Sequence, residues 1–501
     1  MIPPDRAGTL GRTGTGTDDG VRLGLRVNLP QFTLLAVVNF LVGGMVGLER
    51  TVTPLVGTEQ FHLGAIAVAA FVMVFGLTKA ITNAVGGAIT SRYTRKSILV
   101  AGWLIGLPVP FMLAWGPSWA WVIAANAALG VNQGLTWSMT VNMKIDLIGS
   151  GRRGLALGIN ETAGYLGVAV TALATGYLAT GFGLRPAPEL LGAGYVAAGL
   201  ALSVLAVRDT AAWAGAEARQ HPRPDGPRPS VREIAALVSW KDRTLAAASQ
   251  AGLVSNLNDG LVWVVLPVLL VGHGVSVAGV GYVKAFYPFM WAAGMIATGH
   301  LADRIGRKPP IVAGMGIQAA GLAVITAGIS HALAAGLTGA FLLGAGTALV
   351  YPTLLAAVSD ATHPAWRPAA LGIYRFWRDA GYAIGALIGG VTAALASLDA
   401  AIGVAAVLTA ASGLIAWAFM RETHPRPAAG GGRLPYAGRE RRLAQIERQW
   451  CQPVTWLTSP LRARRSSRTR APGASARRSA HAPPPPDRGV PASGRDRDGG
   501  P

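Results

Sequence analysis

Long runs of apolar residues, separated by short clusters of charge, are the feature that most restricts what this chain can fold into. Twelve such runs lie at about 31–57, 62–88, 97–116, 118–143, 153–179, 190–207, 244–271, 277–300, 310–329, 332–358, 368–394 and 398–420. Each is close to or above the roughly 20 residues that an α-helix needs to cross about 30 Å of hydrocarbon. The charged fraction is 14%, well below the roughly one quarter of soluble globular proteins. The sequence therefore predicts an all-α membrane protein with twelve transmembrane helices.

Basic residues fall in alternate loops, which indicates the orientation in the membrane. If the N-terminus is cytoplasmic, the outside loops hold Arg185 as their single Lys or Arg. The cytoplasmic loops hold the rest, namely Arg92, Arg95 and Lys96, then Lys144, Arg152 and Arg153, the segment Arg208 to Arg243, then Arg304, Arg307 and Lys308, and Arg367. By the positive-inside rule, both termini are cytoplasmic and the protein is a multi-pass protein of a bacterial inner membrane.

The net charge of +20 does not indicate a nucleic-acid partner, because much of it lies outside the apolar region. The segment 421–501 holds seventeen arginines against six acidic residues and lacks the apolar content to fold. Residues 1–30 are polar and have no apolar core of the signal-peptide type. The single cysteine, Cys451, excludes a disulfide framework and a cysteine metal site. We expect disordered cytoplasmic ends, no cofactor and no metal.

The chain divides into two similar halves, 31–207 and 244–420, joined by a cytoplasmic linker at 208–243. Asp146 and Asp360 are 214 positions apart, and so are Arg153 and Arg367, each of which opens the same Arg-x-x-Ala-Leu-Gly-Ile pattern. This duplication predicts two pseudo-symmetric bundles of six helices. Within the linker, Ser230 followed three positions later by a glutamate predicts the start of a short helix.

One loop identifies a family. Between the eighth and ninth runs stands Gly299-His-Leu-Ala-Asp303-Arg304-Ile-Gly306-Arg307-Lys308, which closely resembles the Gly-x-x-x-Asp-Arg-x-Gly-Arg-Arg/Lys loop of the major facilitator superfamily of secondary transporters. The resemblance covers about residues 30–420. It implies the twelve-helix fold of that family and a conformational latch formed by this loop, in which the Asp caps a neighbouring helix, pairs with Arg and favours the outward-facing state.

The corresponding loop of the first half is degraded, because Ser91 replaces the acid and Thr94 replaces the glycine. Its basic residues Arg92, Arg95 and Lys96 are either a reduced latch or simple topological anchors. Two further patterns are partial. Glu49-Arg-Thr-Val-Thr-Pro54 resembles the acidic first-helix motif of drug:proton antiporters, and Asn132-Gln133-Gly134 resembles the end of a motif tied to proton transfer.

Ionisable residues within the apolar runs are costly in hydrocarbon and therefore indicate function or internal pairing. Glu161, Glu49 and Asp259 are candidates for proton coupling, with Glu161 first because no simple counter-charge is expected beside it. The candidates for the lining of a substrate cavity are Asn132, Gln133, Asn256, Asn258, Arg375, Arg378, Lys79 and Asp379. Three alternatives stay open: Lys79 pairs with Asp379, one of the two arginines neutralises Asp379, or the asparagines bond between helices.

The leading hypothesis is proton-coupled transport of a small organic solute by alternating access, with efflux favoured and the protein acting as a monomer. A second hypothesis is uptake or facilitated diffusion of an organic anion held by Arg375, Arg378 and Lys79. A membrane sensor built on a transporter scaffold is a third. An enzyme is not expected, because the chain has no Walker loop, no Gly-x-Ser-x-Gly elbow and no metal-ligand spacing.

Overall fold

The computed structural model describes residues 21–89, 93–148, 153–220, 229–362 and 366–424. The N-terminal 20 residues, Arg92 and the basic tail beyond residue 424 lie outside the described residues. The regular secondary structure of the described residues is helical. The predicted all-α class is therefore confirmed.

The helices of the first half are α1 (Leu29–Gly47), α2 (Thr53–Leu55), a π-helical turn (Val56–Gln60), α3 (Ala65–Ile89), α4 (Arg95–Gly106), α5 (Val109–Trp115), α6 (Trp119–Ile148), α7 (Arg153–Phe182) and α8 (Ala187–Leu205). The linker contains α9 (Ala211–Gln220), α10 (Val231–Ala236) and a π-helical turn (Leu237–Lys241). The helices of the second half are α11 (Arg243–Gly272), α12 (Val277–Ile305), α13 (Lys308–Ala327), a 3-10 turn (Ile329–His331), α14 (Ala332–Ala361), α15 (Arg367–Leu395) and α16 (Leu398–Phe419).

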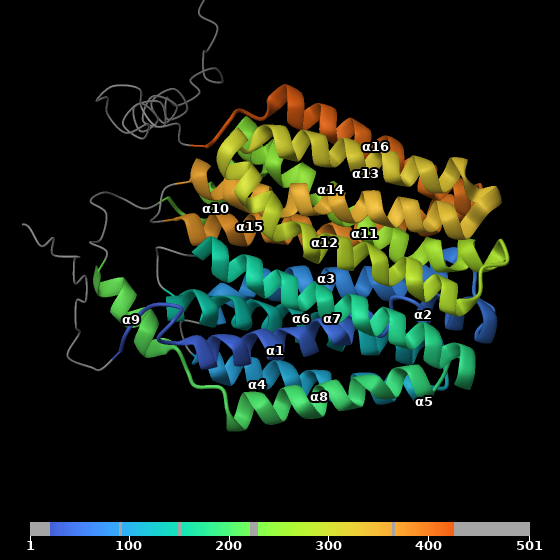
Figure 1. Cartoon of the computed structure of the whole chain (residues 1–501), viewed down its shortest axis with the longest axis horizontal. Helices are drawn as coiled ribbons and strands as arrows, with labels where there is room; N and C mark the ends of the chain where they lie inside the picture. The colour runs from blue at the N-terminus through green and yellow to red at the C-terminus, as the bar shows by residue number, and fades with distance from the viewer. Residues whose placement is uncertain (1–20, 90–92, 149–152, 221–228, 363–365, 425–501) are drawn as a thin grey trace, which may run out of the picture. The chain divides into compact units, whose positions relative to one another are not determined.

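Within the described residues, nine spans are long and apolar enough to cross a membrane by length and composition, the pair α4–α5 counting as one. Three further helices of similar length, α6, α12 and α15, are less apolar. The predicted helix start at Ser230 is also confirmed, because Ser230 and Glu233 form a reciprocal capping box at the start of α10. The long helices lie side by side in Figure 1, with those of the first half in blue to green and those of the second half in yellow-green to orange-red.

Two details of the sequence prediction are wrong. The first apolar run is not one helix, because α1 ends at Gly47 and the next helix, α2, begins at Thr53. Pro54 lies in the first turn of α2, where a missing backbone N–H is tolerated. Lys144 is not a loop residue. It lies in α6 with no exposed surface, because that helix extends five residues beyond the predicted apolar run.

The two halves meet along two seams. Along one seam α3 packs against α15, and along the other α7 packs against α12. Small residues permit both approaches. A Cβ atom at Gly76 would lie 2.6 Å from Cβ of Tyr382, and a Cβ atom at Gly176 would lie 2.9 Å from Cα of Gly281. We call the end of the helices that carries the 208–243 linker the linker end, and the other end the far end.

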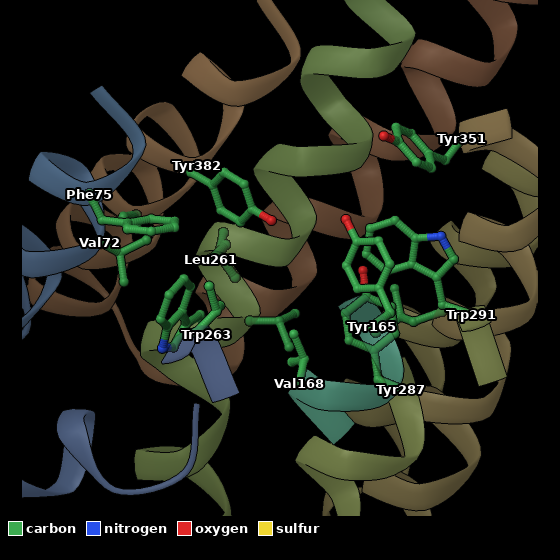
Figure 2. Packing of buried hydrophobic residues seen from close by; sticks show 14 of the residues in the cluster. Val72, Phe75, Tyr165, Val168, Leu261, Trp263, Tyr287, Trp291, Tyr351 and Tyr382 are labelled. Atoms are coloured by element: carbon green, nitrogen blue, oxygen red, sulfur yellow. The ribbon is translucent and has the colours of Figure 1, made fainter. Parts of the chain in front are cut away.

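Aromatic side chains fill the space between the seams. Trp263 of α11 makes edge-on contacts with Phe71 and Phe75 of α3, and Phe75 also contacts Tyr382 of α15. Figure 2 shows Phe75, Trp263 and Tyr382 as one group and Tyr165, Tyr287 and Trp291 as a second. Large rings from both halves therefore close the centre of the molecule in this state.

Candidate functional site

A small polar cavity, here called the central cavity, lies between the two halves. Its lining comes from α3, α6, α7, α14 and α15 and consists of Lys79, Asn83, Trp137, Ser138, Glu161, Tyr165, Tyr351, Arg375, Arg378 and Asp379. All five of its charged residues were candidates from the sequence. Glu161 and Arg375 each lie eight residues from the linker end of their helix, or about 12 Å at 1.5 Å per residue.

The cations of the central cavity differ in how they are neutralised. Arg378 lies 3.2 Å from the carboxylate of Asp379, and its other nitrogen donates to the hydroxyl of Tyr165 at 3.0 Å. Asn83 also donates to Asp379, at 2.6 Å. The expected Lys79–Asp379 ion pair is not among the salt bridges of the described residues, whereas neutralisation of Asp379 by an arginine is confirmed.

Lys79 and Arg375 have no carboxylate within ion-pair distance in the described part of the chain. The ammonium of Lys79 instead lies 5.3 Å from the ring centroid of Tyr382 and 5.5 Å from those of Phe75 and Trp137. Aromatic faces attract a cation but do not cancel its charge. The cavity therefore has two cationic side chains available to an anion.

Glu161 lies beside these cations and is almost fully buried, at 2% exposure. One carboxyl oxygen accepts hydrogen bonds from the indole of Trp137 at 2.9 Å and from Asn160 at 3.3 Å. Its other oxygen has no hydrogen-bond partner among the described residues. Asn160 in turn accepts a 2.6 Å hydrogen bond from the buried ammonium of Lys144. The carboxyl group is thus held in place on one side and free on the other.

A second, narrower cavity, here called the recess, lies within the second half. It is lined by Gly252, Ser255, Asn256, Trp291, Val350, Tyr351, Leu354, Tyr374 and Arg378. Tyr351 and Arg378 line both the recess and the central cavity. Asn256, a cavity candidate from the sequence, therefore lies in the recess, and the two spaces adjoin.

An ion pair between the halves closes the far side of the cavity. Arg50, in the connection after α1, forms a bidentate ion pair with Asp259 of α11, with Nη2 2.9 Å from Oδ2, and both side chains are buried. The guanidinium also lies 4.2 Å from the ring centroid of Trp263, whose indole donates to the carbonyl of Glu49 at 3.0 Å. This pairing favours a gating role for Asp259 over the proton-coupling role considered from the sequence.

Glu49 is fully buried in the first half, away from the central cavity lining. One of its oxygens accepts a 3.1 Å hydrogen bond from Asn126, and the other has no hydrogen-bond partner in the part of the chain that the structure describes. Its position makes it a structural or second protonatable group rather than a direct contact of a solute in the central cavity.

Three polar candidates bond within their own half and do not line either cavity. Asn132 donates to the carbonyl of Gly102 at 2.8 Å, and Gln133 donates to the carbonyl of Val42 at 2.9 Å. Asn258 donates to Gln318 at 3.0 Å and accepts from Thr409. For Asn258, interhelical bonding is the alternative that the sequence left open, and Asn132 and Gln133 also bond between helices.

The loop of the second half forms a charge cluster at the linker end. Arg307 bonds to Asp303 at 2.6 Å and to Asp360 of α14 at 2.9 Å. Asp303 itself is 64% exposed and, among the described residues, its only ion pair is with Arg307. Gly306, at φ +98°, supplies the turn. Among the described residues, the expected capping of a neighbouring helix by Asp303 is not present.

The carboxylate of Glu422, which follows α16, accepts from the backbone N–H groups of Arg307 and Lys308 at 2.8 and 3.1 Å. It thereby caps the N-terminus of α13. Arg304 is exposed, and a Cβ atom at Gly299 would meet open space. Of the six motif positions, Asp303, Gly306, Arg307 and Lys308 therefore carry the described contacts of the turn.

The first half keeps a reduced version of this cluster. Arg95 pairs with Asp146 at 2.6 Å, and the backbone N–H of Lys96 donates to Asp209 at 2.9 Å. Asp209 follows α8 as Glu422 follows α16, at an offset of 422 − 209 = 213 positions. Arg95 and Lys96 are therefore more than topological anchors, although the motif acid is absent.

Sequence reasoning missed several residues of the site. Asn83, Asn160 and Tyr374 were not singled out, and neither was Trp291, whose ring stacks on Tyr165 of the other half with centroids 3.6 Å apart. Asn160 precedes Glu161 directly, and a buried asparagine beside a buried acid is a signal that could have found it. Trp291 and Tyr374 lie in helices rich in aromatic residues and carry no such signal.

Comparisons with known proteins agree with this geometry. A family model described as Major Facilitator Superfamily matches residues 34–255 and 248–467. The crystal structure of a D-xylose-proton symporter matches with a TM-score of 0.63 and 15% identity, over 79% of this chain and 98% of the symporter chain. A mutant of the nucleoside transporter NupG matches with a TM-score of 0.63 and 12% identity, over 78% of this chain and 100% of that chain. No curated protein sequence matches this one.

Proposed function

This chain belongs to the major facilitator superfamily, and from that premise we propose that it is a proton-coupled secondary transporter of a small organic anion. The observation that carries the proposal is the pair of cations, Lys79 and Arg375, that line the central cavity without an acidic partner beside the half-satisfied carboxyl group of Glu161. The protein is not an enzyme. It moves its solute by alternating access, in which a site between two six-helix bundles opens to one side of the membrane at a time.

The charge balance of the cavity favours an anionic solute. Arg378 and Asp379 neutralise each other, so the remaining charges are the two cations and Glu161. A cation removed from water is stabilised by an opposite charge held at hydrogen-bond distance. A carboxylate on the solute supplies that charge, and the guanidinium of Arg375 can bind it with two parallel hydrogen bonds.

Glu161 supports coupling to protons. An ionised carboxyl group in this position competes with the solute for Lys79 and Arg375, whereas a protonated one does not. Binding of the anion and protonation of Glu161 therefore promote each other, and this coupling is reciprocal by thermodynamic linkage. The arrangement favours symport, in which anion and proton move together. Efflux, the direction favoured by the sequence, would instead require antiport, in which binding of the solute displaces the proton.

The test is proton flux in proteoliposomes containing the full chain and an internal pH dye. An anion gradient directed inward, from a panel of aromatic and aliphatic carboxylates, should acidify the lumen with the wild type. Glu161→Gln should abolish acidification, whereas Glu59→Gln, at an exposed acid near the far end, should behave like the wild type. Lys79→Gln and Arg375→Gln should each weaken anion binding about tenfold or more, because a charge-assisted bond is lost.

The sign of proton movement decides between the hypotheses. Alkalinisation of the lumen on anion entry would identify antiport and refute the linkage argument. Anion entry without proton movement in the wild type would exclude proton coupling and favour the hypothesis of facilitated diffusion. The inner-membrane location and monomeric function stay predictions of the sequence.

A further inference from the structure

We propose that the recess is a solute subsite that recognises a hydrogen-bond acceptor on a planar organic anion whose carboxylate lies in the central cavity. This inference rests on the proposed function and narrows its substrate class. It assigns a role to side chains of the second half that take no part in the charge network described above.

The recess contains polar groups that protein atoms leave without partners. Within the described part of the chain, Nδ2 of Asn256, the indole N–H of Trp291 and the hydroxyl of Tyr374 have no hydrogen-bond partner, although their residues are only 3%, 1% and 0% exposed. Buried donors without partners are rare because they lose their bonds to water on burial. Three of them around one space indicate a ligand that supplies acceptors.

The lining is suited to an acceptor rather than to a donor. No carboxylate lines the recess, and Arg378 adds a guanidinium at its boundary with the central cavity. The hydroxyl of Ser255 accepts from Gln318 at 3.2 Å, so its own proton remains available for donation. Amide, indole and guanidinium N–H groups can only donate. A carbonyl, phenolic or ring-nitrogen acceptor matches this set.

The walls of the recess favour a flat group. Trp291 stacks on Tyr165 and meets Tyr351 edge-on, at an interplanar angle of 89°. Figure 2 shows Tyr165, Trp291 and Tyr351 gathered around one space. Gly252 completes the wall, because a Cβ atom there would lie 2.9 Å from the hydroxyl of Tyr374. Aromatic side chains make favourable edge-on and offset-stacked contacts with a planar ring, so Trp291, Tyr351 and Tyr374 of the lining favour an aromatic solute.

The recess adjoins the cavity, so a single solute can reach both. Arg378 and Tyr351 form the common boundary. A carboxylate beside Lys79 and Arg375 would then direct the far end of the molecule past this boundary toward Asn256. In the present state the recess is too narrow to hold a solute, so the helices of the second half that line it, α11, α12, α14 and α15, must move apart to admit one.

The test is binding of matched pairs of carboxylates to the purified full-length protein by isothermal titration. The pairs are benzoate with 4-hydroxybenzoate and cinnamate with 4-hydroxycinnamate, whose members differ by one hydroxyl group that can accept a hydrogen bond. We expect the wild type to bind the hydroxylated member about tenfold more tightly, which is the range for one hydrogen bond to an otherwise unpaired buried donor. Asn256→Leu and Tyr374→Phe should reduce this ratio toward one and leave the affinity for the unsubstituted member within about twofold.

The control is Tyr195→Phe, which removes a hydroxyl that bonds to Thr171, on helices of the first half outside both cavities. It should keep the wild-type ratio. A wild-type ratio near one, or a ratio that survives both recess variants, would overturn the inference while leaving the proposed anion transport in place. Absence of binding by every carboxylate would refute the anion function itself. Tyr374→Phe changes one atom only, so the test holds even if Asn256→Leu fails to fold.

Discussion

The Arg50–Asp259 ion pair allows the closure of the far end to be tested quantitatively. The two side chains are 4% and 1% exposed and come from different halves. Removing one partner leaves an uncompensated buried charge, which costs about 3–5 kcal/mol. Separation of the halves relieves that cost because the remaining charge regains water. At 1.36 kcal/mol for each factor of ten, Arg50→Ala should shift the equilibrium toward the open far end by about 100-fold or more.

The shift is measured by the labelling rate of a buried cysteine. Thr53→Cys places a thiol of similar size near this ion pair, at a position that is 2% exposed. The background carries Cys451→Ser, so that the native cysteine is not labelled. Maleimide labelling should accelerate by about the same factor in Arg50→Ala and in Asp259→Ala. The double variant Arg50→Met with Asp259→Leu should label more slowly than either single variant, because no buried charge remains.

The matched control is Arg232→Ala, which removes an exposed arginine of α10 at the linker end. Exposed polar contacts contribute less than about 1 kcal/mol, so labelling should change by less than about fivefold. Equal labelling rates in the wild type and in both single variants would show that the ion pair does not hold the far end closed.

Two further predictions concern the packing and the linker end. Burial raises the pKa of the Glu422 carboxyl group, but backbone N–H donors lower it more, so its pKa lies below the usual value of 4.5. Its stabilising effect is therefore complete above pH 4.5 and is lost as the pH falls below it, and Glu422→Gln should flatten the acid branch of a melting-temperature profile. A Cβ atom at Gly43 would lie 1.9 Å from the carbonyl oxygen of Gly164, whereas one at Gly194 would meet open space. Gly43→Ala should lower thermal stability by about 1–3 kcal/mol or more, and Gly194→Ala should match or slightly exceed the wild type.

The apolar runs predicted most of the helices because a spanning helix must satisfy its own backbone and expose apolar side chains. The same reasoning failed at residues 48–57 and at Lys144. Hydrophobicity alone does not mark the turn before Pro54. It does not mark the buried end of α6 either, where the ammonium of Lys144 donates a hydrogen bond to Asn160.

The charged residues of the site were predicted better than the neutral ones. A charge in hydrocarbon is costly wherever it points, so Lys79 and Glu161 were recognisable from the sequence alone. The role of an amide side chain cannot be recognised in this way, because an amide bonds equally well to a neighbouring helix or to a solute. Asn258 and Asn256 are two positions apart, yet the first bonds within its half and the second lines the recess. Only the rotation of α11 about its axis distinguishes them.

The glycine contact between α7 and α12 has a kinetic consequence. At Gly176 and Gly281 the backbones meet directly, and a Cβ atom at either would lie about 3 Å from the other residue's Cα. Surfaces without side chains do not interlock, so one helix can turn against the other without repacking. Added bulk on either glycine would press against the facing backbone in this state, so it would lower the population of this state and slow turnover through it.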